Sequence, residues 1–204
     1  MVPAHKVQEC LATLSSESRR LGSLVDNVLT HAQLEEGRSS LVRESLPLSQ
    51  LVERYLQALE LRCEQVNATL KLELKDAGDL LVHTEPQAVG QILFNLVDNA
   101  CKYGLPPTTE SRTLRLFGRC EEHSLALILQ DQGPGIPAAS AQTIFRPFDR
   151  AGRDEGDAAP GVGLGLALCR DLAQALGGSV ELENPGQPGC RFVLRLPRPG
   201  QGEG

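Results

Sequence analysis

The sequence has no tryptophan, and aromatic residues make up only 3% of its 204 residues, so its core must be aliphatic. It also lacks any apolar stretch near the roughly 18 residues that a membrane-spanning helix needs. Its first residues, MVPAHKVQEC, do not show the basic and then apolar pattern of a secretory signal. These absences predict a soluble chain in a cytoplasmic setting.

Basic residues are also fewer than acidic residues, which gives a formal net charge of −6. A nucleic-acid partner is therefore not expected, since it would normally need a basic face. The six cysteines form no CxxC pair. This argues against a zinc site and a disulfide framework and favours reduced, packed thiols. With 41% hydrophobic residues, the chain can build one sizeable core, with or without a helical arm.

Heptad spacing dominates the first part of the chain. The apolar residues on neighbouring lines of one predicted helix are Val7, Leu14, Leu21 and Val28, and Leu11, Val25 and Ala32. Gly37 is placed to end this helix. A lone amphipathic helix cannot bury its own apolar stripe, so it must pack on the following domain, on a second helix or on a copy of itself. Residues 1–37 are therefore predicted to be a helical arm through which two copies associate.

Residues 38–198 read as one mixed domain, followed by a frayed tail at 199–204. A short apolar-polar alternation runs over 40–46. The patterns predict helices over 47–66, 86–103 and 165–176, and strands over 69–74, 80–83, 113–118, 124–131, 179–183 and 190–196. The strands at 113–118 and 124–131, and those at 179–183 and 190–196, are expected to form hairpins. The expected fold class is α+β: a two-layer α/β sandwich with helices on one face of a mostly antiparallel sheet.

A polar strip runs along the helix predicted over 86–103. Asn95, Asn99 and Lys102 are four and three residues apart, with Gln91 one turn before them. Carboxamide oxygens suit a hard cation such as Mg²⁺, and a nearby ammonium suits phosphate. For these residues taken alone, an ordinary solvated face is the simpler interpretation.

Two glycine-containing segments point to a ligand site. Asp131-Gln-Gly-Pro-Gly135 follows a strand, where its glycines allow a tight turn and its carboxylate can accept a hydrogen bond from an exocyclic amine. Gly161-Val-Gly-Leu-Gly-Leu166 runs directly into a helix, whose free N–H groups can bind phosphate. An Asp-Gly turn and a flexible linker are the plain alternatives.

Taken together and in this order, the motifs resemble the catalytic and ATP-binding domain of bacterial sensor histidine kinases. NLVDNACKYG is similar to that family's asparagine box, DQGPG to its first glycine box, IFRPF to its phenylalanine box and GVGLGLAL to its second glycine box. SSESRRLGSLVDNVLTHAQLEEG resembles the second helix of the family's dimerisation hairpin. The resemblance therefore covers most of the chain.

The resemblance implies a role for each matching residue. Asn99 would hold the Mg²⁺ that bridges the ATP phosphates, Asn95 would support it or add a ligand, and Lys102 would contact phosphate; these three would be the catalytic set. Asp131 would bind the adenine amino group. The other residues that the resemblance places around the nucleotide are Tyr103, Gly133, Gly135, Ile136, Phe148, Arg150, Gly161, Val162, Gly163, Leu164, Gly165 and Leu166.

The segment GRDEGDAAPG, at the end of the loop predicted over 137–161, resembles the family's ATP lid. The resemblance implies that Phe145 and Phe148 anchor this lid, although plain core packing would explain them equally well. Arg150, or with less support Arg146, would reach the γ-phosphate; the alternative is a solvated lid charge. The acidic side chains of the lid, at 154, 155 and 157, are expected to face solvent because they would repel phosphates.

Position 95 separates this chain from other proteins with the same nucleotide fold. Chaperones, topoisomerases, mismatch-repair ATPases and anti-sigma serine kinases usually carry a glutamate there, one helical turn before the metal-binding asparagine. An amide cannot take a proton as a base. Asn95 therefore argues against ATP hydrolysis or serine phosphorylation by this domain alone.

None of the four histidines has the family's acceptor pattern, in which an acidic residue follows the histidine directly and a proline comes soon after. They are His5, His31, His83 and His123, of which His5 is the least implausible. The acceptor is therefore expected in a preceding helix or in a separate partner, with a response-regulator aspartate next and a parent protein that can itself be membrane-anchored. The alternative is a non-catalytic dimeric scaffold that keeps the ATP-binding fold.

Overall fold

The computed structural model of the chain describes residues 6, 22, 42–105, 112–149 and 163–198. The chain divides into two compact units, Met1–Ser39 and Ser40–Gly204. The predicted helical arm and the predicted tail at 199–204 lie outside the described residues, so both stay predictions.

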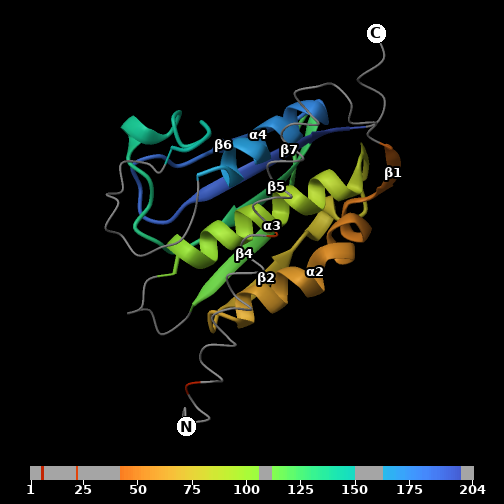
Figure 1. The fold of residues 1–204 in the computed structure, drawn as a ribbon. Coiled ribbons are helices and arrows are strands. Elements are labelled where there is room, and N and C mark those ends of the chain that lie inside the picture. Colours follow the sequence, from red (N-terminus) through yellow and green to blue (C-terminus); the bar gives the residue numbers. More distant parts are fainter. Residues whose placement is uncertain (1–5, 7–21, 23–41, 106–111, 150–162, 199–204) are drawn as a thin grey trace. The chain divides into compact units, whose positions relative to one another are not determined.

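A five-stranded sheet forms one layer of the second unit (Figure 1). Its strand order is β2 (Thr69–Glu73), β4 (Thr113–Cys120), β5 (Ser124–Gln130), β7 (Arg191–Pro197) and β6 (Ser179–Leu182). The β2–β4 pair is parallel, and the other three pairs are antiparallel. A second, two-stranded sheet pairs β1 (Glu44–Pro47) with β3 (Leu81–Thr84).

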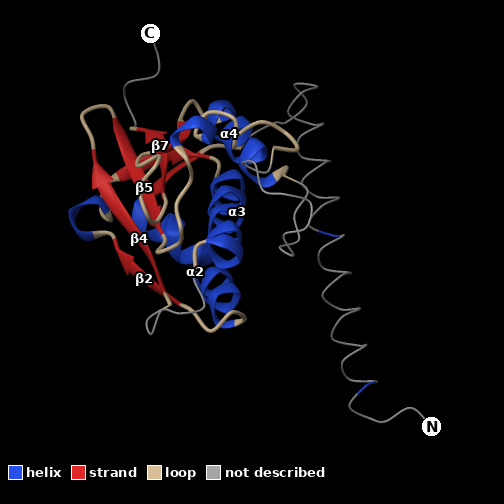
Figure 2. Ribbon diagram, turned by 90° about the vertical axis from the view of Figure 1, so that its left-hand side faces the viewer, coloured by secondary structure: helices blue, strands red, loops and turns tan. Residues whose placement is uncertain are grey.

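Three helices form the other layer: α2 (Leu48–Glu64), α3 (Pro86–Tyr103) and α4 (Gly165–Ala175). Figure 2 shows them on one side of the large sheet. Short 3-10 turns lie at η1 (Lys75–Ala77) and η2 (Ala138–Ser140). The predicted two-layer α/β sandwich with a mostly antiparallel sheet is confirmed.

The core between the layers is aliphatic, as the composition predicts. Its largest fully buried side chains are all leucine or isoleucine, among them Leu93 and Leu96 of α3 and Leu116 and Leu127 of the sheet. Among the described cysteines, Cys63, Cys101, Cys169 and Cys190 are buried and unbridged, and Cys120 is exposed. The prediction of packed thiols therefore holds for the described part of the chain.

Gly118 marks a place where the strand prediction was too short. The predicted strand ended at this glycine, but β4 continues to Cys120. A Cβ at Gly118 would lie 2.9 Å from the Cβ of Ala77 in η1. The glycine is thus needed for the approach of η1 and does not end the strand.

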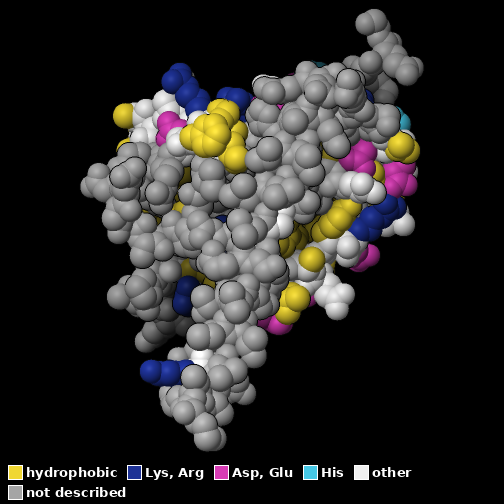
Figure 3. Space-filling model, in the orientation of Figure 1, with side chains coloured by type: hydrophobic (Ala, Val, Ile, Leu, Met, Phe, Trp, Pro, Cys, Tyr) yellow, Lys and Arg dark blue, Asp and Glu magenta, His cyan; other side chains and the backbone are white. Residues whose placement is uncertain are grey.

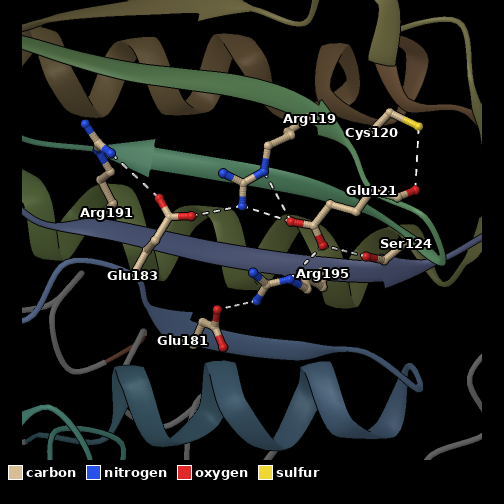
Figure 4. A network of polar contacts seen from close by, with 8 residues as sticks. All are labelled: Arg119, Cys120, Glu121, Ser124, Glu181, Glu183, Arg191 and Arg195. Carbon is tan, nitrogen blue, oxygen red and sulfur yellow. Dashed lines mark hydrogen bonds and ion pairs between the residues drawn. The ribbon is translucent and has the colours of Figure 1, made fainter.

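The sheet face opposite the helices carries a charged network over a small apolar cluster. Ala126, Ile128 and Val193 are fully buried there, with Phe117 packed against them. Around them, Arg119 and Arg195 both bind the Glu121 carboxylate, as Figure 4 shows. This network links β4 and β7 to the β4–β5 turn.

Opposite charges are also mixed on the surface near β1 and α2, at the right-hand edge of Figure 3. There Arg54 of α2 forms an ion pair with Glu44 of β1. The second, smaller sheet is thereby tied to the helical layer.

Candidate functional site

The helix α3 is the platform of the candidate site. It begins at Pro86, because the Glu85 side chain accepts hydrogen bonds from the backbone N–H groups of Gln87 and Ala88. Ten residues of α3 are buried, and they form the face of the helix that packs in the core. Its other face presents the predicted polar strip, including half-buried Asn95 and Asn99.

Asn95 lies next to the start of α4. A Cβ added to Gly165, the first residue of α4, would lie 3.5 Å from Asn95 Oδ1. The Asn95 Nδ2 atom is buried and has no hydrogen-bond partner. The structure therefore brings the second glycine motif and the polar strip together, and it places an unsatisfied amide at their junction.

Asp131 is fixed at the end of β5 and is only 5% exposed. Its Oδ1 accepts hydrogen bonds from the backbone N–H groups of Gly133 and Cys190, each at 2.9 Å. Its own N–H donates to the Cys190 carbonyl at 3.0 Å. Because these bonds lock the carboxylate in place, it can recognise a ligand group without further ordering.

Gly104 joins this carboxylate to α3. A Cβ at Gly104 would lie 2.5 Å from Asp131 Cγ, so the end of α3 and the end of β5 touch at a point where only glycine fits. Sequence reasoning missed this residue. A glycine directly after a helix signals a C-cap, but the pattern does not show which distant side chain packs there.

The first glycine motif makes the tight turn that its sequence predicts. A Cβ at Gly133 would lie 2.7 Å from the Gly104 Cα, and Gly135 has a positive φ of 81°. The Ile136 carbonyl accepts a hydrogen bond from the Gly186 N–H at 2.7 Å. These contacts hold the motif against α3 and the loop that follows β6.

The second glycine motif contacts the phenylalanine motif. Gly163, with a positive φ of 76°, accepts a hydrogen bond from the Phe148 N–H at 3.0 Å. The Phe145 ring is buried and meets Phe192 edge to face, with centroids 6.3 Å apart. The Phe148 ring is 69% exposed, so this residue meets the second glycine motif through its backbone N–H and not through a buried ring.

The remaining predicted residues fall into two groups. Tyr103, Leu164 and Leu166 are half-buried beside the glycine motifs, and Arg146 is exposed. Arg150, Gly161, Val162 and the acidic residues of the lid lie outside the described residues.

Sequence reasoning also missed Asp98. Its carboxylate on α3 pairs with Arg62 of α2 and with Lys102 of α3. The phosphate-binding residue predicted at Lys102 is therefore part of a three-residue charge cluster.

The described residues include no group of three or more His, Cys, Asp or Glu side chains able to hold a metal ion. They also include no helix with both the length and the apolar character needed to cross a membrane.

Comparison with known proteins connects these features to a family. The model of the histidine kinase-, DNA gyrase B- and HSP90-like ATPases matches residues 84–200. The chain is 33% identical over 175 residues to the sensor protein KdpD of Escherichia coli strain K12, covering 86% of this chain and 18% of that protein. It is 30% identical over 190 residues to the alginate biosynthesis sensor protein KinB of Pseudomonas aeruginosa, covering 93% and 30%.

Solved structures share the fold. The histidine kinase AdeS of Acinetobacter baumannii superposes with a TM-score of 0.72 at 23% identity, covering 93% of this chain and 84% of that one. The catalytic domain of histidine kinase ThkA superposes with a TM-score of 0.61 at 22% identity, covering 77% and 97%. The chain spans less than a third of the length of the two curated relatives named above.

Proposed function

Because this chain belongs to the histidine kinase-, DNA gyrase B- and HSP90-like ATPase family, we propose that it is the ATP-binding catalytic portion of a two-component sensor histidine kinase. It transfers the γ-phosphoryl group of ATP to a histidine outside this segment. The observation that carries the proposal is the meeting of three motifs at α3: Asp131 against Gly104, and the start of α4 against Asn95.

The adenine end of the site is Asp131. Its carboxylate is buried and preorganised, which suits it to accept a hydrogen bond from the exocyclic amine of adenine. Gly133 and Gly135 allow the turn to pack closely on Gly104 and on the Gln187 carbonyl, which holds the backbone beside Asp131 in place. Tyr103 flanks the base or the ribose.

The phosphate end is formed by the polar strip of α3 and the start of α4. Glycines at 163 and 165 leave backbone N–H groups accessible at a helix N-terminus, which favours anionic phosphates. Lys102 adds a positive charge at the same strip. The residues from 161 to 166 complete this end, with Phe148 and Arg150 on the lid side.

The side chains of Asn99 and Asn95 fit a Mg²⁺ ion. Both offer neutral carboxamide oxygens of the kind that hard cations accept. The buried Asn95 Nδ2, which has no hydrogen-bond partner, is a donor and suits an acceptor such as a phosphate oxygen. Bound Mg²⁺ would offset the charge of the β- and γ-phosphates. Asn99 would hold the ion, and Asn95 would support it or add a ligand.

The lack of a carboxylate at position 95 favours transfer to histidine over hydrolysis. A hydroxyl or a water needs a base to take its proton, whereas a neutral imidazole is a nucleophile without one. Neither described histidine lies on α3 or α4: His83 is on β3, where it contacts Ser45, and His123 is in the β4–β5 turn. We therefore place the acceptor in another segment or chain.

Two further parts of the proposal concern partners. The helical arm at 1–37 joins two copies, and a response-regulator aspartate receives the phosphoryl group from the histidine. The names of the relatives, which are sensor proteins, support a signalling role.

The test is incubation of the purified chain with γ-labelled ATP and Mg²⁺, alone and with a histidine-containing dimerisation helix hairpin. We expect ATP binding in both cases, and acid-labile, base-stable label on the added hairpin. Label on this chain would show that one of its own histidines is the acceptor, and His5 would be the first histidine to substitute. Absence of ATP binding would refute the proposed function.

A further inference from the structure

Asp98 stands one turn before Lys102 on α3, and its two carboxylate oxygens have different partners. Oδ1 accepts a hydrogen bond from Arg62 Nε at 2.8 Å. Oδ2 lies 2.5 Å from Lys102 Nζ. Since each cation uses its own oxygen, the carboxylate can hold both at the same time.

The cluster is more protected than an ordinary surface ion pair. The side chains of Arg62, Asp98 and Lys102 are 17%, 22% and 28% exposed. For the Arg115–Glu73 pair on the outer sheet face, the exposed fractions are 47% and 34%. Partial burial reduces solvent screening, so the position of Lys102 depends more strongly on its partner.

The cluster also connects two helices. Arg62 belongs to the last turn of α2, and its backbone carbonyl contacts Cys101 Sγ of α3 at 3.9 Å. Arg62 is therefore held by backbone packing as well as by Asp98. Arg62 therefore orients the Asp98 carboxylate, and Asp98 in turn orients Lys102.

We propose that Asp98 is a positioning residue for ATP: it holds the Lys102 ammonium on the polar strip, in the last turn of α3, for contact with the ATP phosphates, and Arg62 holds Asp98 in turn. The proposal rests on the proposed function and deepens it. Lysine is long and flexible, so a fixed partner reduces the ordering that phosphate binding would otherwise require. An ammonium has three N–H donors, and Asp98 engages one side of it.

Charge explains why the cluster includes Arg62. A lysine and an aspartate alone would be neutral and would offer phosphate no net attraction. With Arg62 added, the cluster carries one net positive charge beside an anionic ligand. Arg62 thus offsets the carboxylate that positions Lys102.

The test is a double-mutant cycle on the full chain, with the ATP dissociation constant measured by calorimetry in Mg²⁺. The variants are Asp98→Asn, Lys102→Ala and the double variant. We expect Asp98→Asn alone to weaken ATP binding about tenfold and to have almost no further effect in the Lys102→Ala background. Asp98→Glu, which keeps the charge, should recover part of the affinity.

Glu73→Gln is the matched control, because it removes an ion pair on the outer sheet face and should leave ATP affinity unchanged. Equal effects of Asp98→Asn in both backgrounds would overturn the proposal, as would unchanged affinity in Lys102→Ala. If Asp98→Asn fails to fold, Arg62→Gln replaces it in the cycle, and the same coupling is expected. If the wild-type chain does not bind ATP, the proposed function itself fails; if it binds ATP and the effects are additive, only the positioning role fails.

Discussion

Asp131 has two roles: its side-chain oxygen accepts backbone hydrogen bonds that stabilise the fold, and its negative charge serves the candidate site. Two substitutions separate these roles. Asparagine keeps an oxygen that accepts from the N–H groups of Gly133 and Cys190, but it removes the negative charge. We expect Asp131→Asn to fold with nearly normal stability and to bind ATP at least tenfold more weakly, about 1.4 kcal/mol. Urea unfolding and calorimetry measure the two effects.

Alanine at the same position removes the acceptor altogether. Two buried N–H groups then lose their partner, which should cost about 2 to 4 kcal/mol of unfolding free energy. Equal stability losses in Asp131→Asn and Asp131→Ala would contradict this account of the carboxylate.

At the scale of single residues, a role that depends on neighbouring residues could be predicted from the sequence. A role that depends on contact with a residue far away in the sequence could not. Gly135 was predicted as a turn residue, and its positive φ agrees. Gly104 and Asp98 were missed, because their roles come from Asp131, 27 residues on, and from Arg62, 36 residues back. Sequence periodicity does not encode such contacts.

At the scale of elements, Glu121 joins strands that are far apart in the sequence (Figure 4). Burial alone would raise the pKa of its carboxyl, but hydrogen bonds from Arg195, Ser124 and Arg119 outweigh burial and hold that pKa below its ordinary value of 4.5. A lowered pKa in the folded state means that the ionised form stabilises the fold. This contribution is complete above pH 4.5 and is lost as the pH falls through the lowered pKa.

We therefore predict a difference between the wild-type chain and Glu121→Gln on the acid side of the stability profile. Unfolding free energy should fall less steeply below pH 4.5 in the variant, because the variant has no carboxylate to protonate at this site. Urea unfolding at a series of pH values measures the slopes. Identical slopes would show that the network around Glu121 does not contribute.

Helices and strands were predicted in the right order, whereas their arrangement was not fully predicted. The periodicity over 86–103 coincides with α3 as Pro86–Tyr103, because a buried face and a polar strip repeat at helical spacing. The parallel pairing of β2 with β4 was not predicted, nor was the separate β1–β3 sheet. Alternation identifies a strand but does not specify the strand with which it pairs.

At the scale of the whole molecule, the predicted division of labour between arm and catalytic unit can be tested by truncation. A chain of residues 40–204 contains all the described elements from β1 to β7. We expect it to be a monomer that binds ATP as tightly as the full chain, whereas the full chain should dimerise. Sedimentation velocity over a range of concentrations, together with calorimetry, measures both properties. If residues 40–204 alone form a dimer, the prediction that the arm joins two copies is wrong.

The family resemblance and the geometry agree at this scale because the motifs, although far apart in the sequence, converge on one helix. The asparagine motif lies on α3, the first glycine motif packs against the end of α3, and the second starts α4 beside Asn95. A chain with the same motifs in unconnected places would have no common site. Their convergence on α3 allows one ligand to contact all three motifs.

The Mg²⁺ dependence of ATP binding in the wild-type chain and in Asn99→Ala tests whether the metal and the phosphates bind at α3. Asn99 lies on the polar strip and outside the core, so its loss should leave the melting temperature nearly unchanged. Gln57→Ala, which removes an exposed carboxamide from α2, is the matched control. Calorimetry should show that Mg²⁺ strengthens ATP binding in the wild-type chain and in Gln57→Ala but not in Asn99→Ala. An unchanged Mg²⁺ effect in Asn99→Ala would contradict the placement of the metal and the phosphates at α3.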